Sequence, residues 1–161
     1  MFDKFGEFDS FEELNKAAEG QKEEGDMEAL KELAKENGID EIDALDYIDG
    51  VSGELCTSLT AALGKLQIEE EDMKPSEIVK DWLDYIRSYA MENKHMQRAV
   101  RKKGKSMIGC VGAILKWSYT QKYSVDSRIV KASGISASRV EMGIPGMATA
   151  KKIIREYYME G

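Results

Sequence analysis

Apolar residues recur every three or four positions along most of the chain, and a short polar residue precedes many of these runs. Ser10, Asp26 and Asp40 can each cap a helix, so the pattern predicts three short helices within residues 11–49. Helices this short are unstable alone, so we expect them to pack on one another or on the rest of the chain. The same spacing predicts further helices around Leu55–Leu66, Ile78–Tyr89, Met96–Val100, Ile108–Leu115, Asp126–Ser133 and Ile153–Tyr158.

No stretch alternates between apolar and polar residues for long, which predicts an all-α fold with at most one short extended segment, near Ser138–Met142. Four acidic residues, Glu69–Asp72, come shortly before Pro75, and proline disfavours a helical conformation at Lys74. We therefore interpret residues 69–75 as an exposed connector. The chain would then consist of two small helical subdomains, an acidic one at residues 1–68 and a basic helical bundle at residues 76–161.

The two halves of the chain carry opposite charge. The 161 residues include 23 Lys and Arg against 30 Asp and Glu, a formal net charge of −7. Residues 1–75 hold 22 acidic and 7 basic side chains, whereas residues 76–161 hold 8 acidic and 16 basic ones. Such asymmetry indicates charged partners. The alternative is that both halves have ordinary solvated surfaces that partly attract each other.

Composition excludes several classes of protein. No apolar run approaches the roughly 20 residues that span a bilayer, and Met1–Lys4 does not open a signal peptide, so we expect neither membrane insertion nor secretion. Two cysteines, Cys56 and Cys110, and one histidine, His95, are too few for a disulfide framework or a multi-ligand zinc module. We therefore expect no metal and no cofactor.

Local motifs do not indicate an enzyme. Gly104-Lys105-Ser106 resembles the end of a phosphate-binding loop, but Ala99 stands where that loop requires its first glycine. A helix stop followed by a helix cap explains the triplet better. Acidic residues recur every three positions at Asp40–Asp49, whereas a calcium loop needs them every two, so we interpret them as surface carboxylates. The sequence contains no recognisable pattern of a nucleophile, a base and an orienting group, as a catalytic triad would require. We therefore expect a protein without catalytic residues.

The densest functional candidate is the basic stretch, residues 94–105, which holds six cationic side chains and no acidic one. Most of these recur at spacings of three or four and are expected to share a helix face, with Lys103 beside it. The six are Lys94, Arg98, Arg101, Lys102, Lys103 and Lys105. Such a patch attracts nucleic-acid phosphates or an acidic protein surface. The alternative is an ordinary solvated face whose positive charge balances the acidic half of the chain.

The acidic half offers the mirror-image possibility. Carboxylates held along the short helices of residues 7–54 can imitate the charge of a nucleic-acid backbone and block a basic groove on another protein. Electrostatic complementarity of this kind favours fast association and weakens with salt.

Several segments resemble a known family. They are Phe5–Phe8, Glu12–Asn15, Leu33–Asp40, Asp46–Gly50, Ala62–Leu66, Val100–Ser106, Gly109–Cys110, Gly143–Gly146 and Ile153–Tyr158. Together they resemble small proteins from prophages and conjugative elements of Gram-positive gut bacteria. That group is similar to the PcfK-like proteins, which include inhibitors of type II CRISPR nucleases. The basic stretch and Lys105–Cys110 are the parts most similar to the inhibitors themselves.

The resemblance implies a cytoplasmic, non-enzymatic protein of a bacterial host cell. Its first expected function is to bind and inhibit an RNA-guided CRISPR nuclease, as an anti-CRISPR protein does. The alternative is a nucleic-acid-binding accessory protein of plasmid or phage replication or transfer, acting through residues 94–105. A third possibility is a regulatory helical protein whose charged halves associate head to tail.

Overall fold

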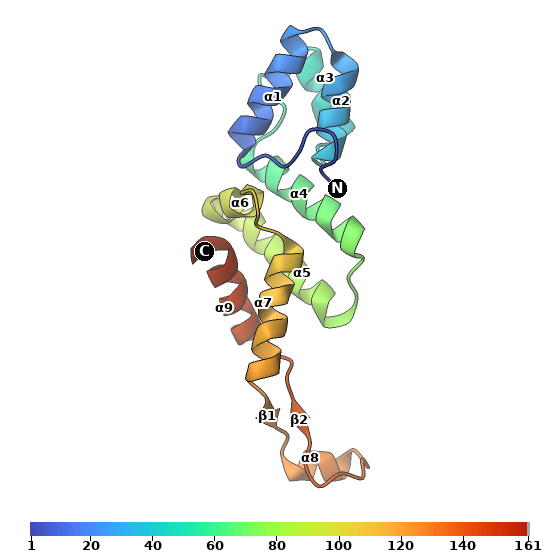
Figure 1. The fold of residues 1–161 in the computed structure, drawn as a ribbon, viewed down its shortest axis with the longest axis vertical. Coiled ribbons are helices and arrows are strands. Elements are labelled where there is room, and N and C mark those ends of the chain that lie inside the picture. Colours follow the sequence, from blue (N-terminus) through green and yellow to red (C-terminus); the bar gives the residue numbers. More distant parts are fainter. Residues whose placement is uncertain (161) are drawn as a thin grey trace.

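The N-terminal part of the chain forms three short helices that begin at polar caps. A computed structural model describes residues 1–160, and three helices come first along the chain (Figure 1): α1 (Phe11–Glu23), α2 (Met27–Glu36) and α3 (Glu41–Ile48). The side chains of Ser10, Asp26 and Asp40 each accept a hydrogen bond from a backbone N–H group in the first turn. These bonds satisfy donors that the helix cannot pair by itself. The predicted caps are confirmed.

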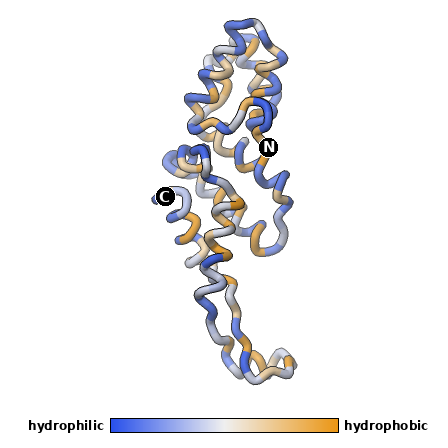
Figure 2. The backbone as a smooth tube through the Cα atoms, viewed as in Figure 1, coloured by the Kyte–Doolittle hydropathy of each residue, from blue (hydrophilic) through white to orange (hydrophobic). Residues whose placement is uncertain are grey.

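These three helices enclose a small hydrophobic core. The N-terminal lobe, residues 11–57, places one apolar face of each helix inward, as the spacing predicts. Figure 2 shows apolar and polar residues alternating along these helices. Its core is formed by Leu14, Ala18, Leu30, Leu33, Ala34, Ile39, Ala44, Tyr47, Leu55 and Cys56, together with Ala61 of the next helix. The acidic side chains of the lobe are left on its outside.

The prediction of an exposed connector at residues 69–75 is wrong for most of this segment. Helix α4 (Ser58–Met73) runs straight through the four acids, and Glu69 is buried. Its Oε2 accepts a hydrogen bond of 3.0 Å from the backbone N–H of Met107. This bond offsets only part of the cost of removing the carboxylate from water, since burial raises the pKa of Glu69. The chain leaves the right-handed helical region at Lys74, next to Pro75, as predicted. The two hydrophobic clusters therefore divide within α4, because Ala61 belongs to the first and Ala62 to the second.

The remaining helices surround a second core. They form the C-terminal body with α4: α5 (Glu77–Glu92), α6 (Lys94–Arg101), α7 (Met107–Thr120), α9 (Met147–Arg155) and the π-helix η1 (Glu156–Glu160). Apolar side chains at helical spacing fill its centre, among them Leu66, Trp82, Leu83, Ile86, Met96, Val100, Met107, Ile114 and Ile154. Ser106 caps α7 as predicted, by accepting a bond from Gly109. Ser76 precedes α5 without such a bond.

A narrow arm, residues 121–146, projects from the end of α7 (Figure 1). Two short antiparallel strands form its stalk, β1 (Tyr123–Ser124) and β2 (Glu141–Met142), with Tyr123 opposite Met142. Helix α8 (Ser127–Ala132) lies at its tip. The extended segment expected near residues 138–142 is present, and it has a second strand as its partner.

The fold is all-α apart from this two-stranded pair, as predicted. Within residues 1–160, no helix is both long enough and apolar enough to cross a membrane.

Candidate functional site

The basic stretch does not form one continuous face. Asn93 caps α6 by accepting a bond of 2.9 Å from the Met96 N–H, and the helix ends at Arg101. Residues 102–106 are therefore a loop. Lys94, Arg98, Lys102 and Lys103 are exposed, and Lys105 is half-buried. Arg101 is buried, because it shares its face of α6 with Gln97, which lies one turn earlier and is also buried. The expectation that it would lie on the exposed basic face is wrong.

The loop after α6 is held by a buried lysine from α4. The Lys65 side chain has no exposed surface, and its Nζ donates to the carbonyl oxygens of Lys102, at 3.1 Å, and Lys105, at 2.7 Å. It also donates to Oε1 of Glu7 at 2.6 Å. Burial lowers the pKa of Lys65, and the hydrogen bond to Glu7 opposes that shift. The sequence gives little sign of this arrangement, since the one acidic residue within a helical turn of Lys65 is Glu69, and Glu7 lies 58 residues earlier.

Carboxylates near the N-terminus accept hydrogen bonds from backbone N–H groups of the same loop. Oε2 of Glu7 accepts the Gly104 N–H at 3.2 Å, and Oδ1 of Asp9 accepts the Lys103 N–H at 3.0 Å. Glu12 forms an exposed ion pair of 2.8 Å with Arg98, whose guanidinium also lies over the Phe11 ring. Part of the basic stretch is therefore neutralised within the molecule.

Arg101 has an incomplete set of hydrogen bonds. Its Nη2 donates to Oδ1 of Asn37 at 2.5 Å, and its guanidinium lies 5.6 Å from the centre of the Phe2 ring. Among the described residues, no partner is found for its Nε and Nη1. Burial lowers the pKa of Arg101, while nearby Cys56, Glu7 and Glu69 act in the opposite direction.

A groove lies beside the outer face of α6. Its volume is about 470 Å³, and it is bounded by three segments of the chain. The N-terminal side supplies Asp9, Ser10 and Phe11, α6 and the loop supply His95, Arg98, Ala99 and Lys102, and η1 supplies Tyr158 and Met159. The groove brings together two cations of the basic stretch, Arg98 and Lys102, with one acid, Asp9.

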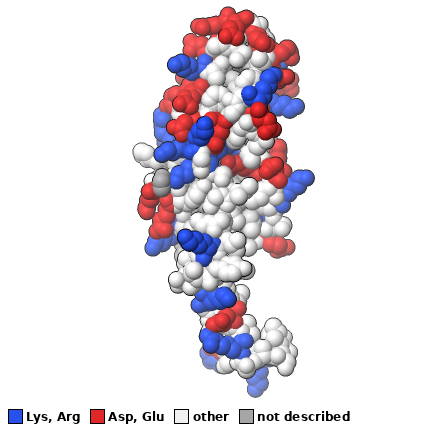
Figure 3. Space-filling model, viewed as in Figure 1, with Lys and Arg blue, Asp and Glu red and all other residues white. Residues whose placement is uncertain are grey.

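The N-terminal lobe presents a strongly acidic exterior. Residues 11–57 contain 15 acidic and 4 basic side chains. Figure 3 shows acidic side chains gathered over the α1–α3 end of the molecule, with basic ones over the arm at the opposite end. The acids at Asp40–Asp49 lie on or beside helix α3, where Asp40 is its cap. Within residues 1–160, no cluster of three or more His, Cys, Asp or Glu side chains is arranged to hold a metal ion.

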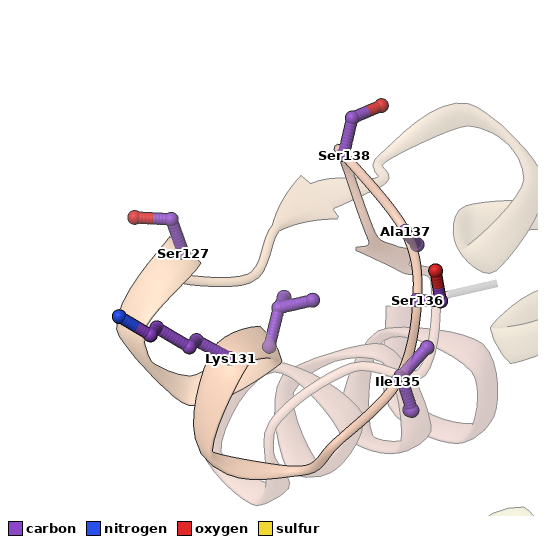
Figure 4. Close-up of a pocket in the computed structure, with 7 residues that line it drawn as sticks. Ser127, Lys131, Ile135, Ser136, Ala137 and Ser138 are labelled. Atoms are coloured by element: carbon purple, nitrogen blue, oxygen red, sulfur yellow. The ribbon is translucent and has the colours of Figure 1, made fainter.

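The arm exposes an unusual number of large apolar side chains. Seven lie on it or at its base: Tyr119, Tyr123, Ile129, Ile135, Met142, Ile144 and Met147. A shallow cavity of about 400 Å³ lies at the tip, between α8 and residues 135–138 (Figure 4). The sequence contained a sign of this exposure, since residues 135–146 include several apolar residues that do not follow a helical spacing.

The two cysteines are buried thiols. Cys56 lies in the N-terminal core and Cys110 in the C-terminal core, as expected for a small buried side chain on α7. Burial raises the pKa of each thiol to about 12. Both are therefore protonated at neutral pH, which is the opposite of an activated nucleophile.

Comparison of the chain with models of known protein families, with curated proteins and with solved structures finds no match.

Proposed function

We propose that this chain is a non-enzymatic protein of a phage or conjugative element that binds and inhibits an RNA-guided CRISPR nuclease. The observation that carries the proposal is the acidic exterior of the N-terminal lobe, with 15 acidic against 4 basic side chains in residues 11–57. The resemblance of the sequence to the PcfK-like group supplies the class of partner.

The acidic lobe has the rigidity that charge imitation needs. Its helices are fixed by a core of their own, so the carboxylates on its outer faces keep their positions relative to one another. RNA-guided nucleases hold the guide–target duplex in a positively charged channel. A rigid acidic surface competes for such a channel with the phosphate backbone, and this competition weakens as salt screens the charges.

The arm provides a second contact of different chemistry. The arm lies at the opposite end of the molecule from the acidic lobe (Figures 1 and 3). It exposes large apolar side chains. Apolar burial is far less sensitive to salt than charge pairing. Two contacts on one molecule reinforce each other, since the second forms at a high effective concentration once the first has formed.

A DNA-cleavage assay tests the proposal. A purified type II effector with its guide RNA is incubated with excess protein before the target DNA is added, and we expect cleavage to be suppressed. Three exposed acids of the lobe, Glu19, Glu23 and Glu24, are then changed to Gln. We expect this variant to inhibit about tenfold less well, a loss typical of weakened electrostatic complementarity.

The control variant removes the same amount of charge from the C-terminal body. It changes the exposed acids Asp72, Asp81 and Glu92 to Asn, Asn and Gln, and it should inhibit as well as the unaltered protein. Undiminished cleavage in the presence of excess unaltered protein would reject the proposal. Equal loss in the two variants would reject the acidic lobe as the contact surface.

The groove beside α6 favours a second candidate, a nucleic-acid-binding accessory protein of plasmid or phage replication or transfer. Lys102 lines the groove, and Lys94 and Lys103 of the same basic stretch are exposed. Within residues 1–160, no ion pair is found for these three side chains. Gel-shift titrations across a salt series test it, because phosphate contacts weaken steeply as salt rises. Absence of a shifted band at low salt, for both single-stranded and duplex DNA, would remove this candidate.

A further inference from the structure

The first nine residues lie across the junction between the two cores as an irregular segment. This N-terminal strap, residues 1–9, contains neither helix nor strand. The backbone N–H groups of Lys4 and Phe5 donate to the Glu36 carboxylate on α2, at 3.1 and 3.0 Å. Phe2 covers Arg101, and Glu7 reaches the loop after α6. The strap is thus held by individual contacts with α2, α6 and the loop after α6, most of which involve a side chain.

Beneath the strap lies a set of donors that is typical of phosphate sites. The N–H groups of Lys103 and Gly104 are consecutive, and Gly104 has a φ of +79°, in the left-handed region. The hydrogen bond that closes this turn runs from the Lys105 N–H to the Lys102 carbonyl at 3.2 Å, so the N–H groups of Lys103 and Gly104 remain available to an anion. Lys65 adds an ammonium group, which has no exposed surface. Arg101 adds a guanidinium group, and only 1% of the surface of this residue is exposed.

Asp9 of the strap accepts the Lys103 N–H at 3.0 Å, and the carboxylate of Glu7 occupies the rest of this set as an anion would. One of its oxygens accepts from Lys65 at 2.6 Å and the other from Gly104 at 3.2 Å. Its charge also acts on Arg101. Glu69 is the other acid near the two cations, and one of its oxygens is bonded to the Met107 N–H. The two carboxylates balance Lys65 and Arg101.

The unpaired donors of Arg101 indicate, independently of the contacts of Glu7, that the site has room for a further anion. A buried guanidinium that leaves Nε and Nη1 without partners, as here among the described residues, is costly. Its Nη2 is bonded to the neutral amide of Asn37. A phosphate group carries more acceptor oxygens than a carboxylate, and arginine can bind it through two parallel N–H bonds.

We infer that the strap covers a phosphate-binding site, in which Glu7 stands where a phosphate group binds once the strap is displaced. The site consists of Lys65, Arg101 and the amides of Lys103 and Gly104. Its ligand is a phosphate group, either free phosphate or a phosphodiester of a nucleic-acid backbone. This inference does not depend on the proposed inhibition of a nuclease.

A pair of variants of the full chain tests the inference. Glu7→Gln removes the charge that occupies the site, whereas Glu12→Gln removes an equal charge from the exposed ion pair with Arg98. Binding of inorganic phosphate is followed through the amide NMR signals of Lys103 and Gly104 at constant ionic strength. Since a competing internal group lowers the fraction of binding-competent molecules, we expect Glu7→Gln to bind phosphate at least about tenfold more tightly than the unaltered chain. Glu12→Gln should bind as the unaltered chain does.

A short single-stranded oligonucleotide distinguishes the two sources of phosphate. If inorganic phosphate shifts the Lys103 and Gly104 signals of Glu7→Gln, the site takes free phosphate. If the oligonucleotide alone shifts them, the site takes a backbone phosphodiester. If neither probe binds Glu7→Gln more tightly than the unaltered chain, Glu7 has a purely structural role and the inference is overturned.

A measurement on the unaltered chain covers the case in which Glu7→Gln does not fold. Lys4 lies in the strap and is exposed, so trypsin cleavage after Lys4 reports displacement of the strap. Phosphate should accelerate this cleavage relative to chloride at the same ionic strength, without accelerating cleavage after the exposed Lys16 of α1. Equal rates in phosphate and chloride would refute displacement by phosphate.

Discussion

Gly38 and Gly64 pack backbone against backbone, and their contact joins the end of α2 to the middle of α4. A Cβ atom placed on Gly64 would lie 2.5 Å from the carbonyl oxygen of Asn37 and 2.8 Å from that of Gly38. Gly38 itself has a φ of +69°, a conformation that other residues rarely adopt. Two glycines therefore set how closely the N-terminal lobe approaches the C-terminal body.

Gly64→Ala should separate these two backbones and destabilise the protein. The added methyl group meets backbone atoms that cannot move aside, so we expect the free energy of unfolding to fall by about 2–3 kcal/mol. Gly112→Ala is the matched control, because Gly112 lies in α7 and a Cβ there meets nothing within 4 Å. It should raise the free energy of unfolding by about 0.5–1 kcal/mol. Urea unfolding followed by circular dichroism measures both, and equal stability of the two variants would contradict the close packing.

Lys65→Met should be among the more damaging single changes. It removes the ammonium group that binds Glu7 and the carbonyls of Lys102 and Lys105, and leaves the partly buried Glu7 carboxylate without its counterion. Breaking a buried ion pair from one side costs about 3–5 kcal/mol. Arg98→Ala breaks an ion pair whose side chains are 57% and 49% exposed, and such pairs contribute at most about 1 kcal/mol. A smaller loss for Lys65→Met than for Arg98→Ala in urea unfolding would show that Lys65 does not stabilise the junction.

Both thiols should be unreactive in the folded protein. Because burial raises the pKa of Cys56 and Cys110 to about 12, almost no thiolate forms at pH 8. We expect a thiol reagent such as Ellman's reagent to label both cysteines only after a denaturant is added. Rapid labelling of either cysteine without denaturant would mean that its core opens readily.

Glu70 should make stability depend on pH in the acid range. Burial pushes its pKa upward, but hydrogen bonds from Lys80 and Arg87 outweigh this effect, and its pKa lies below the ordinary 4.5. A carboxyl with a lowered folded-state pKa contributes stability above its unfolded pKa, and this contribution is lost as the pH falls through the folded pKa. The difference in unfolding free energy between the unaltered protein and Glu70→Gln should therefore be constant from pH 7 to about pH 5 and shrink below pH 4.5. A difference that does not change with pH would contradict this assignment.

Local interactions made much of the fold predictable. Ser10, Asp26, Asp40 and Ser106 begin helices at the predicted places because a capping side chain bonds amides only two or three residues away. Apolar spacing predicts the inward faces for the same reason, since one helical turn determines which residues lie side by side. The all-α class follows from these local patterns.

The candidate site was less predictable, because its geometry depends on residues far apart in the chain. A run of cations identified residues 94–105, but the inward direction of Arg101 depends on Asn37, which lies 64 residues earlier. The burial of Glu69 depends on Met107, and β1 exists because β2 lies beside it. The sequence alone therefore determined the helices and the distribution of charge. Tertiary packing decided which charges meet, because long-range contacts place Glu7 on Lys65 and leave other acids in water.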